Sequence, residues 1–203
     1  MQNVRIGIIG MGNIGRTYKN NRHNVGFMCL DRFAELHKLK AKKAHNYSYF
    51  RYDSGVLIKP STYMNQSGEA YLSALSAYSD IDDVLVVMDD IDLPLGEIKI
   101  RPSGGDGGHN GLKSILAKAG NREIHRIRIG IGRQTNVNPK DHVLTDFSAE
   151  ERKIILPVID LVVRWLEIYL NSDFNALLDE FSQWKKNPIP TSEAGINRPK
   201  EDS

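Results

Sequence analysis

The chain is poor in cysteine, because its 203 residues include only Cys29. A lone thiol cannot close an internal disulfide, and it excludes a metal site built from several thiolates. Cys29 lies within the apolar run 27–30. We therefore expect it to pack as a small hydrophobic side chain and not to act as a nucleophile.

Long apolar runs are also absent. No stretch approaches the roughly 18 consecutive apolar residues of a membrane-spanning helix. Residues 1–9 reach a short strand-like run and do not resemble a secretory signal peptide. We therefore expect a soluble, cytoplasmic protein that makes no contact with membranes.

Two common hydrolytic motifs are missing. The sequence contains neither the G-x-S-x-G elbow of many serine hydrolases nor the H-E-x-x-H motif of zinc proteases. The six histidines have no ligand spacing, so a metallohydrolase is an alternative that the sequence does not favour. We interpret most of them as ordinary surface or core residues, and we expect His109 to hold its loop in place. This group of ordinary residues comprises His37, His45, His125 and His142.

A large excess of one charge is lacking too, since the formal net charge is +2. The charges are unevenly distributed, however. Residues 1–60 carry 11 Lys and Arg against 3 Asp and Glu, residues 61–100 carry 1 against 8, and residues 101–140 carry 8 against 2. The two basic segments could form a polyanion-binding face after folding, or they could be ordinary solvated surface.

The hydrophobic pattern predicts alternating strands and helices. We expect strands over residues 4–9, 84–88, 97–101 and 127–132, two short strands within 46–59 of which the second is 56–58, and helices over 24–39, 68–79, 112–119, 149–169 and 174–184. Pro157 is expected to kink the fourth helix or to mark the join of two helices. This order is typical of an α/β fold, with one globular domain over residues 1–184 around a central, twisted, mixed sheet flanked by helices. Residues 185–203 lack periodicity, and we expect them to form a mobile tail.

Three polar, loop-like segments carry residues that a protein core would not use. They are Gly12–Gly15 with the Arg22-His23-Asn24 run that follows, Lys59–Gly68, and Gly104–Gly111. Glycines in such numbers allow the backbone to approach a ligand closely. Because each segment bears an asparagine, we expect the three to assemble one active site.

The first of these segments also satisfies G-x-G-x-x-G over residues 10–15, the pattern of a dinucleotide-binding loop. Its context is unfavourable. Residues 16–24 make a poor helix start, and the strand at 56–58 ends in Lys59-Pro60 where an acidic residue would bind a ribose. A nucleotide-dependent oxidoreductase is therefore disfavoured, and a tight turn explains these glycines equally well.

His23 is the best candidate for a general base. An imidazole of near-neutral pKa can deprotonate water at physiological pH, provided that an acceptor orients its other nitrogen. Asp89, Asp90 and Asp92 cluster at the end of the most apolar strand, where α/β proteins build their sites. At least one of the three is expected to be only a solvated turn residue.

Four motifs, in order, resemble the bacterial-type peptidyl-tRNA hydrolase family. They begin at residues 10, 59, 89 and 104, and read Gly-x-Gly-Asn-x-Gly-x-x-Tyr-x-x-x-Arg-His-Asn-x-Gly-Phe, Lys-Pro-x-Thr-Tyr-Met-Asn-x-Ser-Gly, Asp-Asp-x-Asp-Leu-Pro-x-Gly and Gly-Gly-x-Gly-Gly-His-Asn-Gly-Leu-Lys-Ser. The resemblance covers about residues 4–150. It implies an enzyme without metal or cofactor that hydrolyses the ester joining a peptide to the 3′ end of tRNA, and so recycles tRNA from stalled translation.

The resemblance also implies roles for individual residues. His23 would be the general base, and Asp89 would orient it. Asn13, also catalytic, would line the cleft with the substrate-binding residues Asn65 and Asn110, and these amides would bind the peptide carbonyl, the oxyanion or the attacking water. The further substrate and tRNA contacts would come from Tyr18 and Tyr63 near the ester and from Lys99 and Arg128 on the tRNA 5′-phosphate. We expect a monomer.

The sequence departs from the family's usual pattern at two positions. Ile14 stands where a proline is common, and Asn21 stands where a threonine is common. Both flank the site, and no matched catalytic position is lost. The remaining alternative is an RNA-binding or splicing-type protein on the same scaffold with little hydrolase activity.

Overall fold

The structure is a computed structural model, and it describes residues 5–53 and 55–186. Its centre is a seven-stranded sheet in the order β2-β3-β4-β1-β5-β7-β6. The strands are β1 (Ile6–Gly10), β2 (Lys42–Lys43), β3 (Tyr47–Tyr52), β4 (Gly55–Pro60), β5 (Asp83–Asp90), β6 (Ile98–Arg101) and β7 (His125–Gly130). Strands β4, β1, β5 and β7 are parallel, while β2, β3 and β6 pair antiparallel with their neighbours. The predicted α/β class with one mixed sheet is confirmed.

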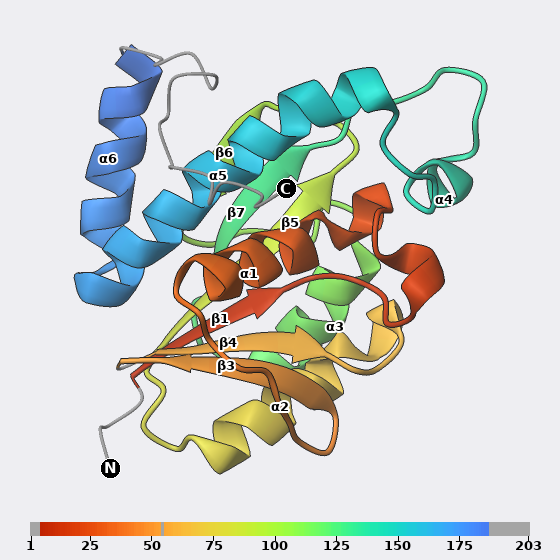
Figure 1. The fold of residues 1–203 in the computed structure, drawn as a ribbon. Helices are drawn as coiled ribbons and strands as arrows, with labels where there is room; N and C mark the ends of the chain where they lie inside the picture. The colour runs from red at the N-terminus through yellow and green to blue at the C-terminus, as the bar shows by residue number, and fades with distance from the viewer. Residues whose placement is uncertain (1–4, 54, 187–203) are drawn as a thin grey trace, which may run out of the picture.

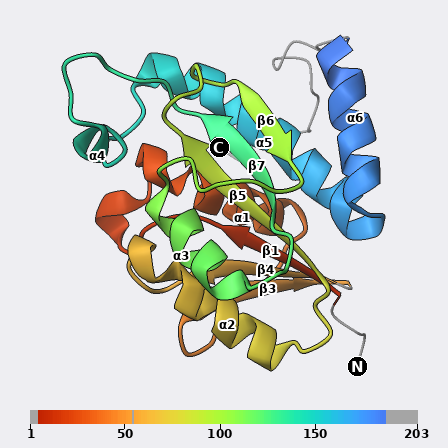
Figure 2. The ribbon, with the colours of Figure 1, turned by 180° about the vertical axis from the view of Figure 1, so that it is seen from behind.

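Helices cover both faces of the sheet (Figures 1 and 2). They are α1 (Val25–Leu36), α2 (Ser67–Ala77), α3 (Asn110–Ala119), the short α4 (Pro139–His142), α5 (Ala149–Asn171) and α6 (Phe174–Lys186). Helices α1, α5 and α6 share one hydrophobic cluster with the sheet, and α2 and α3 share the other. Neighbouring residues of β1 divide between them, Ile8 in the first cluster and Ile9 in the second, because successive side chains of a strand point to opposite faces.

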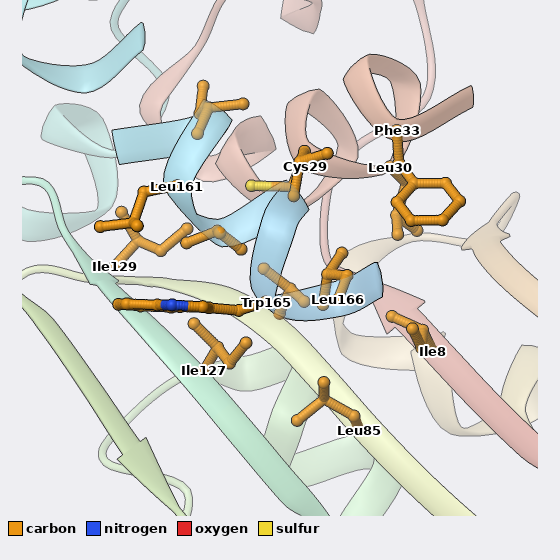
Figure 3. Packing of buried hydrophobic residues seen from close by; sticks show 14 of the residues in the cluster. Ile8, Cys29, Leu30, Phe33, Leu85, Ile127, Ile129, Leu161, Trp165 and Leu166 are labelled. Atoms are coloured by element: carbon orange, nitrogen blue, oxygen red, sulfur yellow. The ribbon is translucent and has the colours of Figure 1, made fainter. Parts of the chain in front are cut away.

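The larger cluster is centred on α5. Trp165 and Leu166 are fully buried against strand residues, and Figure 3 shows Trp165 lying flat over Ile127. Cys29 packs in the same cluster with no exposed surface, as its apolar neighbours predicted, and burial raises the pKa of its thiol. The thiol is therefore an inert part of the core.

Helix α5 decides one of the two alternatives expected for Pro157. The proline lies inside one continuous helix of 23 residues, so it does not join two helices. A capping box starts the helix, because Ser148 and Glu151 exchange side-chain to backbone hydrogen bonds. Ten buried residues of this helix supply the packing that tolerates an internal proline.

Two short elements and the end of the last helix differ from what the sequence pattern predicts. The pattern did not predict β2 or α4, which have two and four residues and carry no readable period. Helix α6 continues to Lys186, and the remainder of the expected tail, residues 187–203, lies outside the described residues. Within residues 5–53 and 55–186, no helix is long and apolar enough to cross a bilayer.

Candidate active site

The candidate site lies at the carboxyl ends of the parallel strands. In Figure 1 the arrowheads of β1, β4 and β5 point to the same side of the molecule, and the loops that leave them hold the polar segments found in the sequence. Asn13 follows β1, Tyr63 and Asn65 follow β4, and Asp89 is the penultimate residue of β5. The parallel sheet thus gathers residues that lie far apart in the sequence.

His23 reaches this edge because helix α1 packs unusually close to the strands. The imidazole belongs to a three-residue 3₁₀ turn, Arg22–Asn24, directly before α1. At Gly26, a β-carbon would lie 2.3 Å from the Val87 carbonyl oxygen and 2.5 Å from the Met11 backbone nitrogen. Only a glycine permits this approach, which sets the start of α1, and His23 with it, against the ends of β1 and β5.

One oxygen of Asp89 serves two histidines. Its Oδ1 lies 2.8 Å from Nδ1 of His23 and 3.1 Å from Nε2 of His109, and the two imidazole rings are 4.9 Å apart between centroids. The carboxylate is 3% exposed. Burial raises the pKa of Asp89, but the charges and hydrogen bonds of His23 and His109 outweigh it and hold that pKa well below its usual range. Asp89 is therefore ionised and accepts both bonds.

The hydrogen bonds assign the tautomers of both histidines. Nδ1 of His109 accepts the backbone N–H of Leu112 at 3.2 Å, so the proton of the neutral ring is on Nε2 and is donated to Asp89. His23 donates from Nδ1 to the same oxygen, which leaves the lone pair on Nε2. None of the hydrogen bonds among the described residues uses that Nε2. His109 thus holds the loop, as expected, and also shares the carboxylate, which the sequence did not indicate.

Electrostatics favour the protonated form of His23. Burial lowers the pKa of His23, but the charge of Asp89 and the hydrogen bond to it raise that pKa further, so the net shift is upward. An imidazolium at this position is stabilised by an ionised partner 2.8 Å away. A base that becomes positively charged during a reaction benefits from this arrangement.

The three asparagine segments converge around Gly111. A β-carbon at Gly111 would lie 2.1 Å from Cε of Met11, 2.5 Å from Sδ of Met64 and 3.1 Å from the His109 ring. These contacts join the loop after β1, the 3₁₀ turn after β4 and the start of α3. Each loop carries one of the predicted amides next to the contact: Asn13, Asn65 and Asn110. In the part of the chain that the structure describes, no hydrogen bond occupies these three side-chain amides.

Asn24 is a site residue whose role the sequence did not predict. Its Oδ1 accepts the backbone N–H of Asn13 at 2.8 Å, and its Nδ2 donates to the Asn13 carbonyl at 2.9 Å. Asn24 is buried, and it follows His23 directly. The residues of one turn therefore fix the Asn13 backbone and present the imidazole. The only available signal was the Arg-His-Asn run at residues 22–24. That run does not reveal whether the asparagine side chain contacts substrate or bonds to backbone.

The remaining predicted residues lie around this centre. The side chains of Tyr18 and Tyr63 are solvent-exposed on the loops that follow β1 and β4. Lys99 and Arg128 face each other in the register of β6 and β7. They are ion-paired, Arg128 with Asp90 and Lys99 with Glu97, the latter at 3.5 Å.

Among the three acids clustered at the end of β5, Asp92 is solvated, whereas Asp89 and Asp90 are buried. The two departures from the family pattern also differ in setting. Ile14 is exposed, whereas Asn21 is buried and its amide donates to the Leu144 carbonyl.

His23, Asp89 and His109 also have the composition of a metal site, since their ligand atoms lie within 4.8 Å of one another. The hydrogen bonds argue against that use. The shared oxygen lies at ordinary hydrogen-bond distances from two N–H donors, and a metal on Nε2 of His109 would require the proton to move to Nδ1, where it would break the bond to Leu112. The residues fit a hydrogen-bonded triad better than a metal centre.

Fold and site together define a class: an α/β enzyme with a histidine–aspartate pair at the carboxyl ends of its strands, where loops that bear uncharged amides converge. The family model for peptidyl-tRNA hydrolase matches residues 7–189. Peptidyl-tRNA hydrolase of Bacillus subtilis (strain 168) is 42% identical over 183 residues, which cover 86% of this chain and 97% of that protein. The chain therefore belongs to the peptidyl-tRNA hydrolase family.

Two further relatives agree. Peptidyl-tRNA hydrolase of Pseudothermotoga lettingae is 39% identical over 181 residues, covering 88% of this chain and 97% of that protein. A crystal structure of peptidyl-tRNA hydrolase from Acinetobacter baumannii superposes with a TM-score of 0.76 at 28% identity, covering 84% of this chain and 91% of that one. The resemblance stated from the four motifs is confirmed.

Proposed function

We propose that this protein hydrolyses the ester bond between a peptide and tRNA, with His23 as the general base and peptidyl-tRNA as the substrate. The observation that carries the proposal is the bond from Nδ1 of His23 to Asp89, which leaves the Nε2 lone pair free in a site where three loops bearing uncharged amides converge. Membership of the family and the identity of its relatives support the substrate class.

The chemistry requires one proton acceptor and no covalent enzyme intermediate. Nε2 of His23 takes a proton from water while the water oxygen attacks the ester carbonyl carbon. The imidazolium then returns the proton to the departing ribose oxygen, and Asp89 stabilises the positive charge in between. A positioned base contributes roughly 10²–10⁴-fold to the rate, which suits an ester that is already activated.

The amides of Asn13, Asn65 and Asn110 provide the uncharged donors and acceptors. One side-chain N–H directed at the developing oxyanion contributes roughly 10²–10³-fold. An asparagine can also read the N-acyl carbonyl, which peptidyl-tRNA has and free aminoacyl-tRNA lacks. Exchanging Asn13 for Asp or Ala is therefore expected to weaken the preference for N-blocked substrates. An unchanged preference would show that Asn13 does not read this group.

The outer residues bind the nucleic acid. Tyr18 and Tyr63 present exposed rings near the site for the substrate end, and Lys99 and Arg128 bind the 5′-phosphate of the tRNA. Both cations already have carboxylate partners, Glu97 and Asp90, so a phosphate has to compete with them. If this assignment is right, Lys99→Met raises KM and flattens the salt dependence of binding, because fewer counterions are released.

We propose that the enzyme works as a monomer in the cytoplasm, without a metal or a cofactor. All the residues in the proposed mechanism come from one chain, and the hydrogen bonds of His109 oppose metal binding at the triad. An RNA-binding protein with little activity is the less favoured alternative. A protein that only binds RNA would not need a histidine whose Nδ1 is bonded to a buried aspartate and whose Nε2 is free to act as a base.

The test measures release of N-acetyl-amino acid from N-acetyl-aminoacyl-tRNA in the presence of EDTA, with unblocked aminoacyl-tRNA as the comparison substrate. Wild type and the exposed-histidine control His45→Ala are expected to cleave the blocked substrate, and His23→Ala is expected to lose at least 10²-fold. Loss of activity with EDTA would contradict the metal-free mechanism. Absence of cleavage by wild type, with salt-dependent tRNA binding retained, would favour the RNA-binding alternative.

A further inference from the structure

Arg22, the residue directly before His23, is charged and yet buried, with 3% of its side chain exposed. Its Nε donates to Oγ1 of Thr145 at 3.1 Å, one terminal nitrogen donates to Oε2 of Glu151 at 2.8 Å, and the guanidinium lies 5.0 Å from the centroid of the Phe147 ring. Removing a guanidinium from water is costly unless it is paired. The proposed chemistry does not use this charge, so its burial requires another explanation.

Glu151 has two functions at the start of α5. Its Oε2 accepts the backbone N–H of Ser148 at 2.7 Å, which closes the capping box, and the same oxygen accepts from Arg22. Burial raises the pKa of Glu151, but the hydrogen bonds from Arg22 and Ser148 outweigh it, so the net shift is downward. The carboxylate that caps the helix is thus also the counter-ion of the buried arginine.

The backbone around Arg22 is tied to the same region. The backbone N–H of Arg22 donates to the Thr145 carbonyl at 3.0 Å, and that of His23 donates to the Val143 carbonyl at 2.9 Å. Asn21 forms an isolated antiparallel bridge with Asp146. Figure 1 shows α4 and the beginning of α5 beside the segment that joins β1 to α1. Residues 143–151 therefore form a strap over the turn that carries His23.

The turn itself has little intrinsic support. It is a 3₁₀ helix of three residues, and the side chain at its N-cap, Asn21, makes no capping bond. Short 3₁₀ turns have poor hydrogen-bond geometry. Contacts from outside the turn must hold it so that Nδ1 of His23 stays 2.8 Å from Asp89.

We propose that Arg22 and Glu151 are positioning residues for the base. Their ion pair locks the His23 turn to the start of α5 and so maintains the His23–Asp89 hydrogen bond. The inference rests on the proposed function for its kinetic test only, because the geometry of the imidazole can be measured without substrate.

Three variants separate positioning from helix capping. Glu151→Gln keeps a residue that can close the capping box but removes the counter-ion of Arg22. Arg22→Met removes the charge and keeps an unbranched apolar stem against Phe147. The double variant removes both charges, and replacing a buried ion pair by uncharged groups is often neutral for stability.

A matched control is available on the same helix. Nε of Arg32 lies 2.8 Å from Oδ1 of Asp160, so this pair also joins α1 to α5, with both side chains about four-fifths buried. It makes no contact with the His23 turn among the described interactions. Asp160→Asn is therefore expected to lower thermal stability and to leave kcat and KM unchanged.

The kinetic measurement uses N-acetyl-aminoacyl-tRNA at a temperature where every variant is folded. Glu151→Gln and Arg22→Met are expected to lose roughly 10–100-fold in kcat with KM within about twofold, because a displaced base affects chemistry more than binding. The double variant is expected to regain thermal stability but not kcat. Recovery of kcat together with stability, or wild-type kcat in both single variants, would overturn the inference.

The structural measurement follows the Nδ1 proton of His23 by NMR. Wild type and Asp160→Asn are expected to show a hydrogen-bonded, slowly exchanging imidazole proton that is lost in Asp89→Ala, which has no acceptor, and weakened in Glu151→Gln. An unperturbed proton in Glu151→Gln would overturn the positioning role. If wild type fails to cleave the substrate while the NMR differences appear, the proposed function fails and the positioning inference stands.

Discussion

The double use of Asp89 leads to a quantitative prediction for Asp89→Asn. One oxygen of Asp89 accepts from His23 and from His109, and the ring of His109 has its proton fixed on Nε2 by the bond from Leu112. In the variant, the amide oxygen is the group that can accept that proton, so His109 keeps the oxygen in place. His23 then still donates from Nδ1, through a weaker bond to an uncharged acceptor, and its Nε2 remains a base.

The fall in kcat in Asp89→Asn is therefore expected to reflect the missing charge at position 89, because the tautomer of His23 is unchanged. Two unit charges about 4 Å apart interact by about 4 kcal/mol at an effective dielectric constant of about 20. With roughly half of the imidazolium charge developed in the transition state, Asp89 contributes about 2 kcal/mol. At about 1.4 kcal/mol per tenfold, this corresponds to roughly a 30-fold loss of kcat in Asp89→Asn. An inverted tautomer would cost about 10⁴-fold.

His109→Asn supplies the critical comparison. Asparagine is a good N-cap and should keep the cap of α3, but it removes the ring that contacts Asp89. With Asp89 present, the loss should be below about fivefold, because either carboxylate oxygen can accept from His23. In the double variant His109→Asn with Asp89→Asn, no ring holds the amide at position 89. That amide can then turn its NH₂ group toward Nδ1 of His23, and kcat is expected to fall by about a further 100-fold. Additive losses would refute the reasoning.

The assay is the pH dependence of kcat/KM with N-acetyl-aminoacyl-tRNA. His23 must be neutral to act as a base, and its pKa is raised above the ordinary 6.5, so the wild-type rate should rise with pH through a midpoint above 6.5. Without the charge of Asp89, burial dominates and the midpoint should move to lower pH. A midpoint that stays in place, or a loss near 10⁴-fold in the single variant, would show that Asp89 does not act in this way.

Further predictions concern stability and can be measured by urea or thermal unfolding. Gly26→Ala should be strongly destabilising, because its β-carbon would lie 2.3 Å from the Val87 carbonyl oxygen, and Gly26→Ser should be at least as damaging. Trp165→Ala should cost about 3–5 kcal/mol because the indole is fully buried, whereas the exposed Leu156→Ala on the same helix should stay within about 0.5 kcal/mol. The pKa of Asp89 is depressed in the folded state, so its contribution is present above the unfolded pKa of about 3.9 and should fade as the pH falls through the folded value. A stability difference between wild type and Asp89→Asn that grows on acidification would contradict this sign.

Much of the fold could be predicted from periodicity. The strands predicted at 84–88 and 127–132 correspond to β5 and β7, and the helix predicted at 149–169 corresponds to α5. Of the two expectations for Pro157, the join of two helices is wrong, because a local rule for proline does not include the packing of the other residues of that helix. The order of strands in the sheet was not available from the sequence, since it depends on which elements pack together.

The composition of the candidate site was predicted, but its connections were not. The polar, glycine-rich segments pointed to His23 and to an assembled site, and the resemblance carried by the four motifs pointed to Asp89 and the three asparagines. That Asp89 gives one oxygen to both His23 and His109 depends on angles and distances that no spacing encodes. The same applies to the reciprocal bonds between Asn24 and Asn13.

By itself, the sequence determined the α/β class, the family and the chemical character of the site, because apolar periodicity and rare polar motifs are local properties of the chain. Only the tertiary structure decided which nitrogen of His23 is free, since the tautomer follows from an acceptor 66 residues away. It also decided that Arg22 pairs with Glu151, 129 residues away, because a buried charge takes whichever partner the packing of α1 against α5 brings within hydrogen-bond distance.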